Sequence, residues 1–217
     1  TAYLYSSVER TAEGVGSPRY LSTVGPFARQ WEALFRDAMG PVGWPSHPVL
    51  MARFGLCAMR SARAFWRSIF ATEEGRLLFA GLAAHSLLPM EQTPSAAIGL
   101  MLAIAAHGPG WPFPKGGAQT LSNAMAGYFE SLGGVIRTGV DIHRLEEVET
   151  TGPVFFETAP RHLARICKDA LPERYCQRLN RFAHGPGVFK LDWALDGPIP
   201  WTDSGVGRAG TVHLGTL

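Results

Sequence analysis

Apolar residues recur with a helical period over the first 132 residues of the chain. Residues that favour helix starts, such as Pro26, Thr72 and Pro94, precede several of these apolar segments, and glycines follow them. We expect helices at about residues 26–39, 48–70, 72–88, 94–107 and 118–132. The segment 94–106 has no charged residue. A helix that is apolar on every side is either buried in a core or lines an apolar cavity.

After residue 132 the apolar residues begin to alternate, which is typical of strands. The segments that show this alternation are 135–138, 140–142, 154–156, 188–195 and 211–214, with further helices expected at about 158–169 and 172–182. Helices followed by strands predict an α+β fold. In that fold a helical layer packs on one face of a mixed β-sheet.

Composition narrows the class of protein without naming a function. The chain has 217 residues, 46% of them hydrophobic, and a net charge of +2, so we expect an ordered globular protein. This charge does not favour a nucleic-acid partner. The three cysteines fit a reducing cytoplasm, and neither they nor the seven histidines have metal-site spacing, so we expect no metal. No apolar run reaches the ~20 residues of a membrane-spanning helix.

Arginines recur on one side of the expected helix 48–70. Arg53, Arg60, Arg63 and Arg67 follow a helical spacing and share a face. Such a face either is solvated opposite the apolar core residues or contacts anionic lipid headgroups, so peripheral membrane contact stays open.

Motifs for common catalytic sites are absent from the sequence. Residues 205–210 match GxGxxG, but no helix follows to bind a pyrophosphate. Neither a G-x-S-x-G elbow nor a phosphate-binding Walker loop occurs. We therefore assign no catalytic residue.

Six segments, taken in their order and spacing, carry a family pattern. They are Gly81–Ser86, Gly110–Gly117 with Leu121, Gly133–Ile136 with Val140, Thr158–Arg161, Gly185–Asp196 and Ala209–Gly215. Together they resemble the phytoene-dehydrogenase-like FAD-dependent oxidoreductases of the carotenoid-desaturase and amine-oxidase type. The resemblance covers nearly the whole chain. The F-K-L-D-W-A-L-D stretch at 189–196 is its most specific part.

The resemblance implies a fold and a division of the chain. The fold would be the substrate-domain part of a glutathione-reductase-type FAD oxidoreductase. Residues 1–132 would form a mainly helical substrate-binding part, 133–160 an excursion into the FAD-binding domain, and 161–217 a sheet-forming return. Family members also have an opening GxGxxG motif and a closing glycine-rich segment that this sequence lacks. We therefore expect an interior fragment, inactive alone and without bound FAD, whose complete protein binds FAD.

The resemblance also implies site residues. Cofactor contacts would come from Val140, Thr158, Ala159 and Pro160, and the substrate pocket from Trp111, Phe113, Lys115, Gly116 and Gly117. Each has a purely structural alternative. Val140 can be core, Thr158 a helix N-cap, and the two glycines packing positions. Lys115 is either a solvated lysine or a proton-handling group.

The implied function is the substrate-binding portion of an FAD-dependent dehydrogenase that acts on a small apolar substrate. Helices 73–88 and 94–106 would form walls of its pocket. The alternative is a stand-alone domain that binds a hydrophobic ligand or partner without redox activity. Strands that lack the FAD domain would have open edges, so we also expect self-association.

Overall fold

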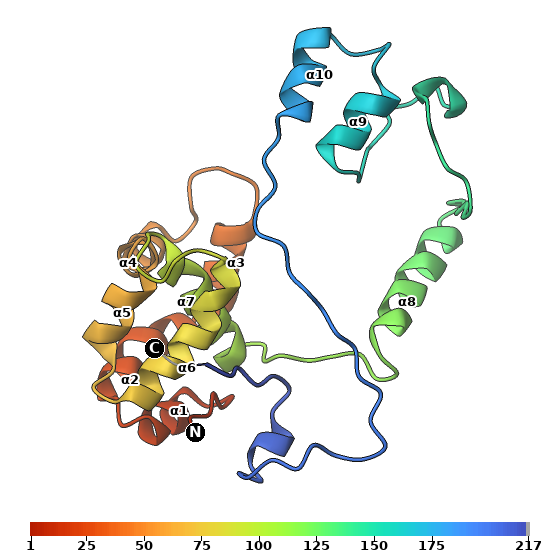
Figure 1. The fold of residues 1–217 in the computed structure, drawn as a ribbon. Helices are drawn as coiled ribbons and strands as arrows, with labels where there is room; N and C mark the ends of the chain where they lie inside the picture. The colour runs from red at the N-terminus through yellow and green to blue at the C-terminus, as the bar shows by residue number, and fades with distance from the viewer. Residues whose placement is uncertain (216–217) are drawn as a thin grey trace. The chain divides into compact units, whose positions relative to one another are not determined.

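The computed structural model describes residues 1–215, which form helices and irregular connections (Figure 1). Helix accounts for 50% of the structure, and no strand occurs among the described residues. The predicted α+β fold, with its helical layer on a mixed β-sheet, is therefore wrong. The sheet of a glutathione-reductase-type substrate domain is missing with it.

The expected strands fail because a strand needs a partner. Its N–H and C=O groups must pair with a neighbouring strand, and alternation along one segment does not supply that neighbour. The segments at 135–138, 140–142, 154–156, 188–195 and 211–214 have no regular secondary structure. Their large apolar side chains are correspondingly exposed, including Val135, Phe155 and Trp193.

The chain divides into two compact units, which we describe separately. The first contains Thr1–Pro112 and Asp192–Leu217, and the second contains Phe113–Leu191. The helices of the first unit are α1 (Val8–Gly14), α2 (Pro18–Ala28), α3 (Trp31–Met39), α4 (Pro48–Ala58), α5 (Ala62–Ile69), α6 (Glu73–Ala83) and α7 (Ser95–His107), with the short 3-10 helices η1 (Ala84–Ser86) and η3 (Val206–Arg208).

Hydroxyl side chains begin four of these helices. The hydroxyl oxygens of Ser7, Ser17, Ser61 and Thr72 accept hydrogen bonds from backbone N–H groups three residues further on. Each cap satisfies an N–H group that has no partner within its own helix. The expected helix start at Thr72 is confirmed.

Helix α7 lies at the core of the first unit, where it contacts α2, α4, α5 and α6. Its residues Leu100, Ala103 and Ile104 are completely buried. Gly99 brings α7 close to α6, because a Cβ atom there would lie 2.9 Å from Phe79 Cζ and 3.1 Å from Ala83 Cα. The helix without charges therefore packs in the core. Of the two roles expected for it, core packing or lining an apolar cavity, the structure shows the first.

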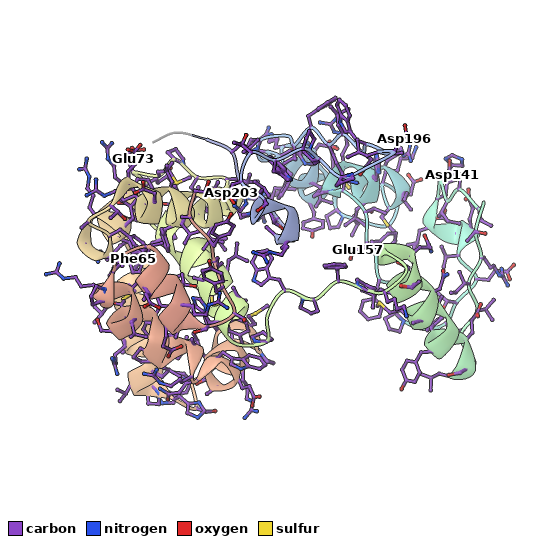
Figure 2. The ribbon with its side chains drawn as sticks, turned by 90° about the horizontal axis from the view of Figure 1, so that it is seen from below. Phe65, Glu73, Asp141, Glu157, Asp196 and Asp203 are labelled. Carbon is purple, nitrogen blue, oxygen red and sulfur yellow. The ribbon has the colours of Figure 1, made fainter. Side chains whose placement is uncertain are left out.

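Aromatic rings extend this core. The rings of Phe65 and Phe79 lie with their centroids 4.7 Å apart, and Phe70 contacts Phe79 in turn. Figure 2 shows Phe65 on α5, among the helices of the first unit. Both Phe65 and Phe79 are almost fully buried.

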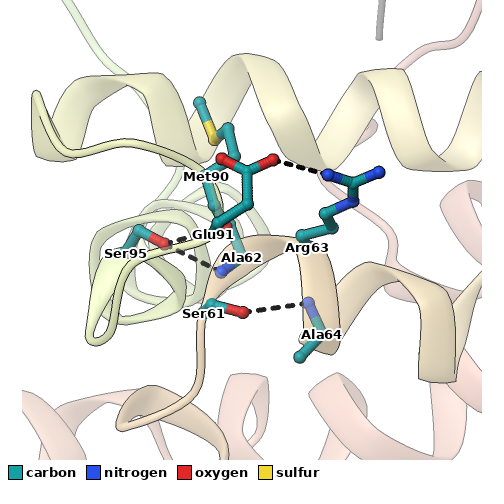
Figure 3. A network of polar contacts seen from close by, with 7 residues as sticks. All are labelled: Ser61, Ala62, Arg63, Ala64, Met90, Glu91 and Ser95. Atoms are coloured by element: carbon teal, nitrogen blue, oxygen red, sulfur yellow. Dashed lines mark hydrogen bonds and ion pairs between the residues drawn. The ribbon is translucent and has the colours of Figure 1, made fainter.

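The helix expected at 48–70 is broken between α4 and α5. The break is stabilised by polar contacts with the first residue of α7 and with the segment before it (Figure 3). The Oγ of Ser95 accepts from the N–H of Ala62 at 2.8 Å, and the N–H of Arg63 donates to the Met90 carbonyl at 2.9 Å. Tertiary partners therefore satisfy backbone groups that a continuous helix would have used.

The helix expected at 26–39 is also divided, between α2 and α3. Ser17 caps α2 and Pro18 occupies its first turn, so the helix starts earlier than expected. Pro26 consequently lies inside α2 rather than at a helix start.

The second unit contains α8 (Ala118–Ser131), the short 3-10 helix η2 (Leu145–Glu147), α9 (Pro160–Ile166) and α10 (Glu173–Asn180). Helices α9 and α10 pack together, and Ala164 and Cys167 are buried in this unit. Helix α8 buries none of its residues and exposes Leu121, Met125 and Phe129. Little of this unit's apolar surface is therefore covered.

We predict that Gly99→Val destabilises the first unit by about 1–3 kcal/mol, because the added atoms overlap Phe79 and Ala83. Gly55→Val in α4 is the matched control, since no atom lies within 4 Å of a Cβ there. Urea unfolding followed by circular dichroism measures both. Equal midpoints for the two variants would contradict the close packing of α6 on α7.

Candidate functional site

His85 and His213 bring together two of the segments that carry the family resemblance. Their Nε2 atoms are 3.0 Å apart, although the residues are 128 positions apart in sequence. The rings meet edge to face with their centroids 5.2 Å apart. His85 lies in η1, directly after α6, and His213 lies in the C-terminal segment of the first unit.

Gly81 makes this approach feasible. A Cβ atom at Gly81 would lie 2.7 Å from Nδ1 and 2.8 Å from Cγ of His213. Any larger residue would push the His213 ring away from α6. Leu87 then turns the chain sharply after η1, with a left-handed φ of 56°. The local sequence thus shapes both sides of the histidine pair.

The geometry allows the two histidines to share one proton. A hydrogen bond between two Nε2 atoms needs one protonated and one unprotonated nitrogen. Partial burial lowers the pKa of His213, and the positive form of His85 lowers it further. The contact therefore allows one proton to lie between the two Nε2 atoms. Within residues 1–215, no three His, Cys, Asp or Glu side chains gather to form a metal group.

Tyr20 and His107 form a second polar pair that the sequence did not reveal. The Tyr20 hydroxyl lies 2.7 Å from His107 Nε2. Burial raises the pKa of Tyr20. Burial also lowers the pKa of His107, although the nearby backbone of Ser6 and Tyr5 and the Glu9 carboxylate act to raise it. The Nδ1 atom of His107 is buried and makes no hydrogen bond within the described chain.

His107 also lines a surface depression of about 360 Å³ that contains Ser7, Glu9 and Arg29. This mixture of charges and hydroxyls differs from the apolar pocket expected between helices 73–88 and 94–106. Tyr20 and His107 are 87 positions apart and belong to no motif. Only the packing of α2 against α7 brings them together.

A neighbouring depression of about 420 Å³ contains Arg29, Arg36 and His47. Asp37 stabilises one side of it by accepting from the His47 N–H at 2.7 Å and lying 3.1 Å from its Nδ1. Burial acts to raise the pKa of Asp37, but hydrogen bonds from the His47 and Ser46 backbone and the His47 ring outweigh it and lower the pKa.

The expected cofactor residues lie in the second unit. Val140 is 60% exposed on a connecting segment, one residue before Asp141, which Figure 2 labels. Ala159 is the N-cap of α9 and Pro160 is its first residue. The N-cap role expected for Thr158 is therefore wrong, since the helix starts one residue later.

The expected substrate residues fall on both sides of the unit boundary. Trp111 belongs to the first unit, and Phe113, which is 81% exposed, begins the second. Residues from these positions line neither depression described above.

Gly116 and Gly117 have a local structural task. Both have φ near +90°, a conformation that other residues rarely adopt. The Gly117 N–H donates to the Pro114 carbonyl at 3.0 Å, and the Thr120 hydroxyl donates to the Gly117 carbonyl at 2.7 Å. The turn after Lys115 thus leads the chain into α8. Positive φ accounts for the glycine at 117 and tight packing does not, because no atom lies within 4 Å of a Cβ position there.

These residues do not form an FAD cradle by themselves. Gly139, beside Val140, has no atom within 4 Å of a Cβ position, so the backbone there borders open space. Helix α9 has only seven residues, and its N-cap makes no side-chain hydrogen bond. We therefore derive no chemical step through FAD from the described residues.

Comparison of the chain with protein-family models, curated proteins and solved structures finds no match. Among residues 1–215, none of the helices has both the length and the apolar character needed to cross a bilayer.

We predict that His85→Asn raises the pKa of His213 but leaves it below the ordinary histidine value. The substitution removes the nearby positive charge, whereas partial burial remains. NMR titration of the imidazole resonances measures the change, with His162→Asn in α9 as the control. An unchanged His213 pKa in the His85→Asn variant would contradict the pairing.

The lowered pKa also sets the direction of a pH effect on stability. The folded chain keeps His213 neutral at pH values where the unfolded chain binds a proton. Its contribution to stability is complete above about pH 6.5 and is lost as the pH falls below that value. The lowered pKa of His107 changes stability with pH in the same direction. The part due to His213 is therefore the difference in the free energy of unfolding between the parent and the His213→Asn chains, measured across this pH range.

Proposed function

We propose that this chain supplies the substrate-binding portion of an FAD-dependent oxidoreductase that acts on an apolar substrate. The supporting observation is the contact between His85 and His213, whose Nε2 atoms are 3.0 Å apart. The segments Gly81–Ser86 and Ala209–Gly215 both belong to the family resemblance. Two segments that carry the resemblance and lie far apart in sequence are therefore in contact in the structure.

The uncovered apolar residues agree with this proposal. Phe189, Leu191 and Trp193 lie in the most family-specific segment and are each at least 64% exposed. Isolated surface residues of this kind are ordinary, but soluble proteins seldom expose large apolar patches, and here several large apolar side chains within one short segment are exposed. Under the proposal, further protein covers these side chains and provides most of the contacts to FAD.

The roles of this chain's own residues follow from that arrangement. Helices α6 and α7 form a rigid support, and α6 with η1 presents His85 beside the C-terminal segment. The histidine pair holds one proton near the surface of the first unit. FAD would supply two-electron chemistry to the complete enzyme. We assign the histidines a positioning and proton-holding role, and no catalytic residue is named.

A second candidate function is a stand-alone domain that binds a hydrophobic ligand or partner without redox activity. The exposed apolar surface of α8, with Met125 66% exposed, is compatible with it. A flavin distinguishes the two functions, because only the first requires one.

The test is isolation of the native protein with an antibody raised against the chain. We expect a polypeptide heavier than 23.5 kDa that contains the chain's peptides and shows the visible absorbance of a flavin. Mass spectrometry of the heat-released pigment should identify FAD. An antibody blocked with the purified chain is the control.

A colourless native protein whose mass equals that of the chain would overturn the proposal. If that protein also binds an apolar dye such as anilinonaphthalene sulfonate, the stand-alone function is favoured. If the native protein is a flavoprotein, the His85→Gln and His213→Gln variants test the histidine pair. A pH profile of the reaction that neither variant changes would contradict the role given to the pair.

A further inference from the structure

Large apolar side chains are exposed at the end of α3, on the loop that follows it, and along α4 to its C-cap. The exposed members are Met39, Val42, Trp44, Val49, Leu56 and Met59, which we call the α4 surface. Trp44 is 90% exposed and Leu56 is 77% exposed. Helix α4 buries Leu50 and Phe54 in the core, so it is apolar on both its inner and its outer side.

The outer residues of α4 share one helical face. Val49 and Leu56 are seven residues apart, and Arg53 lies between them at a spacing of four and three. All three are exposed. An arginine therefore lies in the middle of the exposed apolar stripe, where its charge and the apolar groups can engage one surface together.

A buried carboxylate fixes the shape of the preceding loop. Asp37 accepts from the His47 N–H at 2.7 Å and lies 3.1 Å from the His47 ring nitrogen, and its side chain is only 4% exposed. These contacts close the loop that presents Val42 and Trp44. The one carboxylate at the loop's base is thus held by His47 and is not exposed beside the α4 surface.

The residues of the α4 surface lie in a stretch of sequence whose formal charges have a single sign. Between Asp37 and Glu73 the chain has no acidic residue but has four arginines. The structure corrects the expectation that all four share one helical face, because the chain breaks at Arg60. Arg60 bonds to the Ala64 carbonyl and the Ser68 hydroxyl, and Arg63 pairs with Glu91 at 2.8 Å (Figure 3).

We propose that the α4 surface docks onto a lipid bilayer with anionic headgroups. Tryptophan is favoured at the boundary between headgroups and acyl chains. The apolar stripe would enter this boundary while Arg53 contacts phosphate or carboxylate headgroups. A protein partner of ordinary composition would not require 35 residues without a carboxylate, whereas an anionic bilayer repels every carboxylate near it. This inference does not depend on the proposed oxidoreductase function.

Co-sedimentation of the full chain with vesicles tests the proposal. We expect binding to phosphatidylcholine vesicles that contain a minority of phosphatidylserine, weaker binding to phosphatidylcholine alone, and release by salt. Leu56→Glu should weaken the binding at least about tenfold, since it removes apolar contact and adds repulsion. Arg53→Glu should weaken binding to the anionic vesicles more than binding to the neutral ones.

Leu132→Glu is the matched control, because Leu132 is 69% exposed and lies in the second unit. Circular dichroism verifies that each variant keeps the helical content of the parent chain. Absence of vesicle binding by the parent, or equal loss in Leu56→Glu and Leu132→Glu, would overturn the proposal. A parent dimer that Leu56→Glu converts to a monomer, without vesicle binding, would instead identify the occupant as a second copy.

Discussion

Burial of α7 is the interaction on which the first unit depends. Four helices lie against this one uncharged helix, and its small residues let them approach closely. Full burial of a side chain such as Leu100 or Ile104 stabilises a fold by about 1.5–3 kcal/mol. Because α7 has no polar face, removing any neighbouring helix would expose apolar surface, which couples the helices to one another.

The same packing positions the polar groups. Gly99 sets the distance between α7 and α6, and α6 leads directly into η1 and His85. At the other end of α7, His107 meets Tyr20 of α2. Both histidine environments therefore lie at ends of helices whose position the core decides. Each contact joins residues that are distant in sequence, so neither would form without the packing of the core.

Local sequence was a good guide wherever the cause of a structure is local. The start of α6 at Thr72 and the path of residues 116–118 into α8 depend on groups within a few residues. It failed where the cause lies elsewhere in the chain. Ser95 stabilises the break before Ala62 from 33 positions away, and alternating residues near Trp193 found no neighbouring strand.

The sequence by itself determined that 94–107 is a helix with no charged face and that most other helices lie where their caps and periodicity indicate. It also carried the family resemblance, which rests on residue identity and not on shape. Tertiary structure decided that no sheet forms among residues 1–215, that His85 reaches His213, and that the α4 surface stays uncovered. The physical reason is range: caps and periodicity act within a helical turn or two, whereas pairing and burial depend on which distant segments become neighbours.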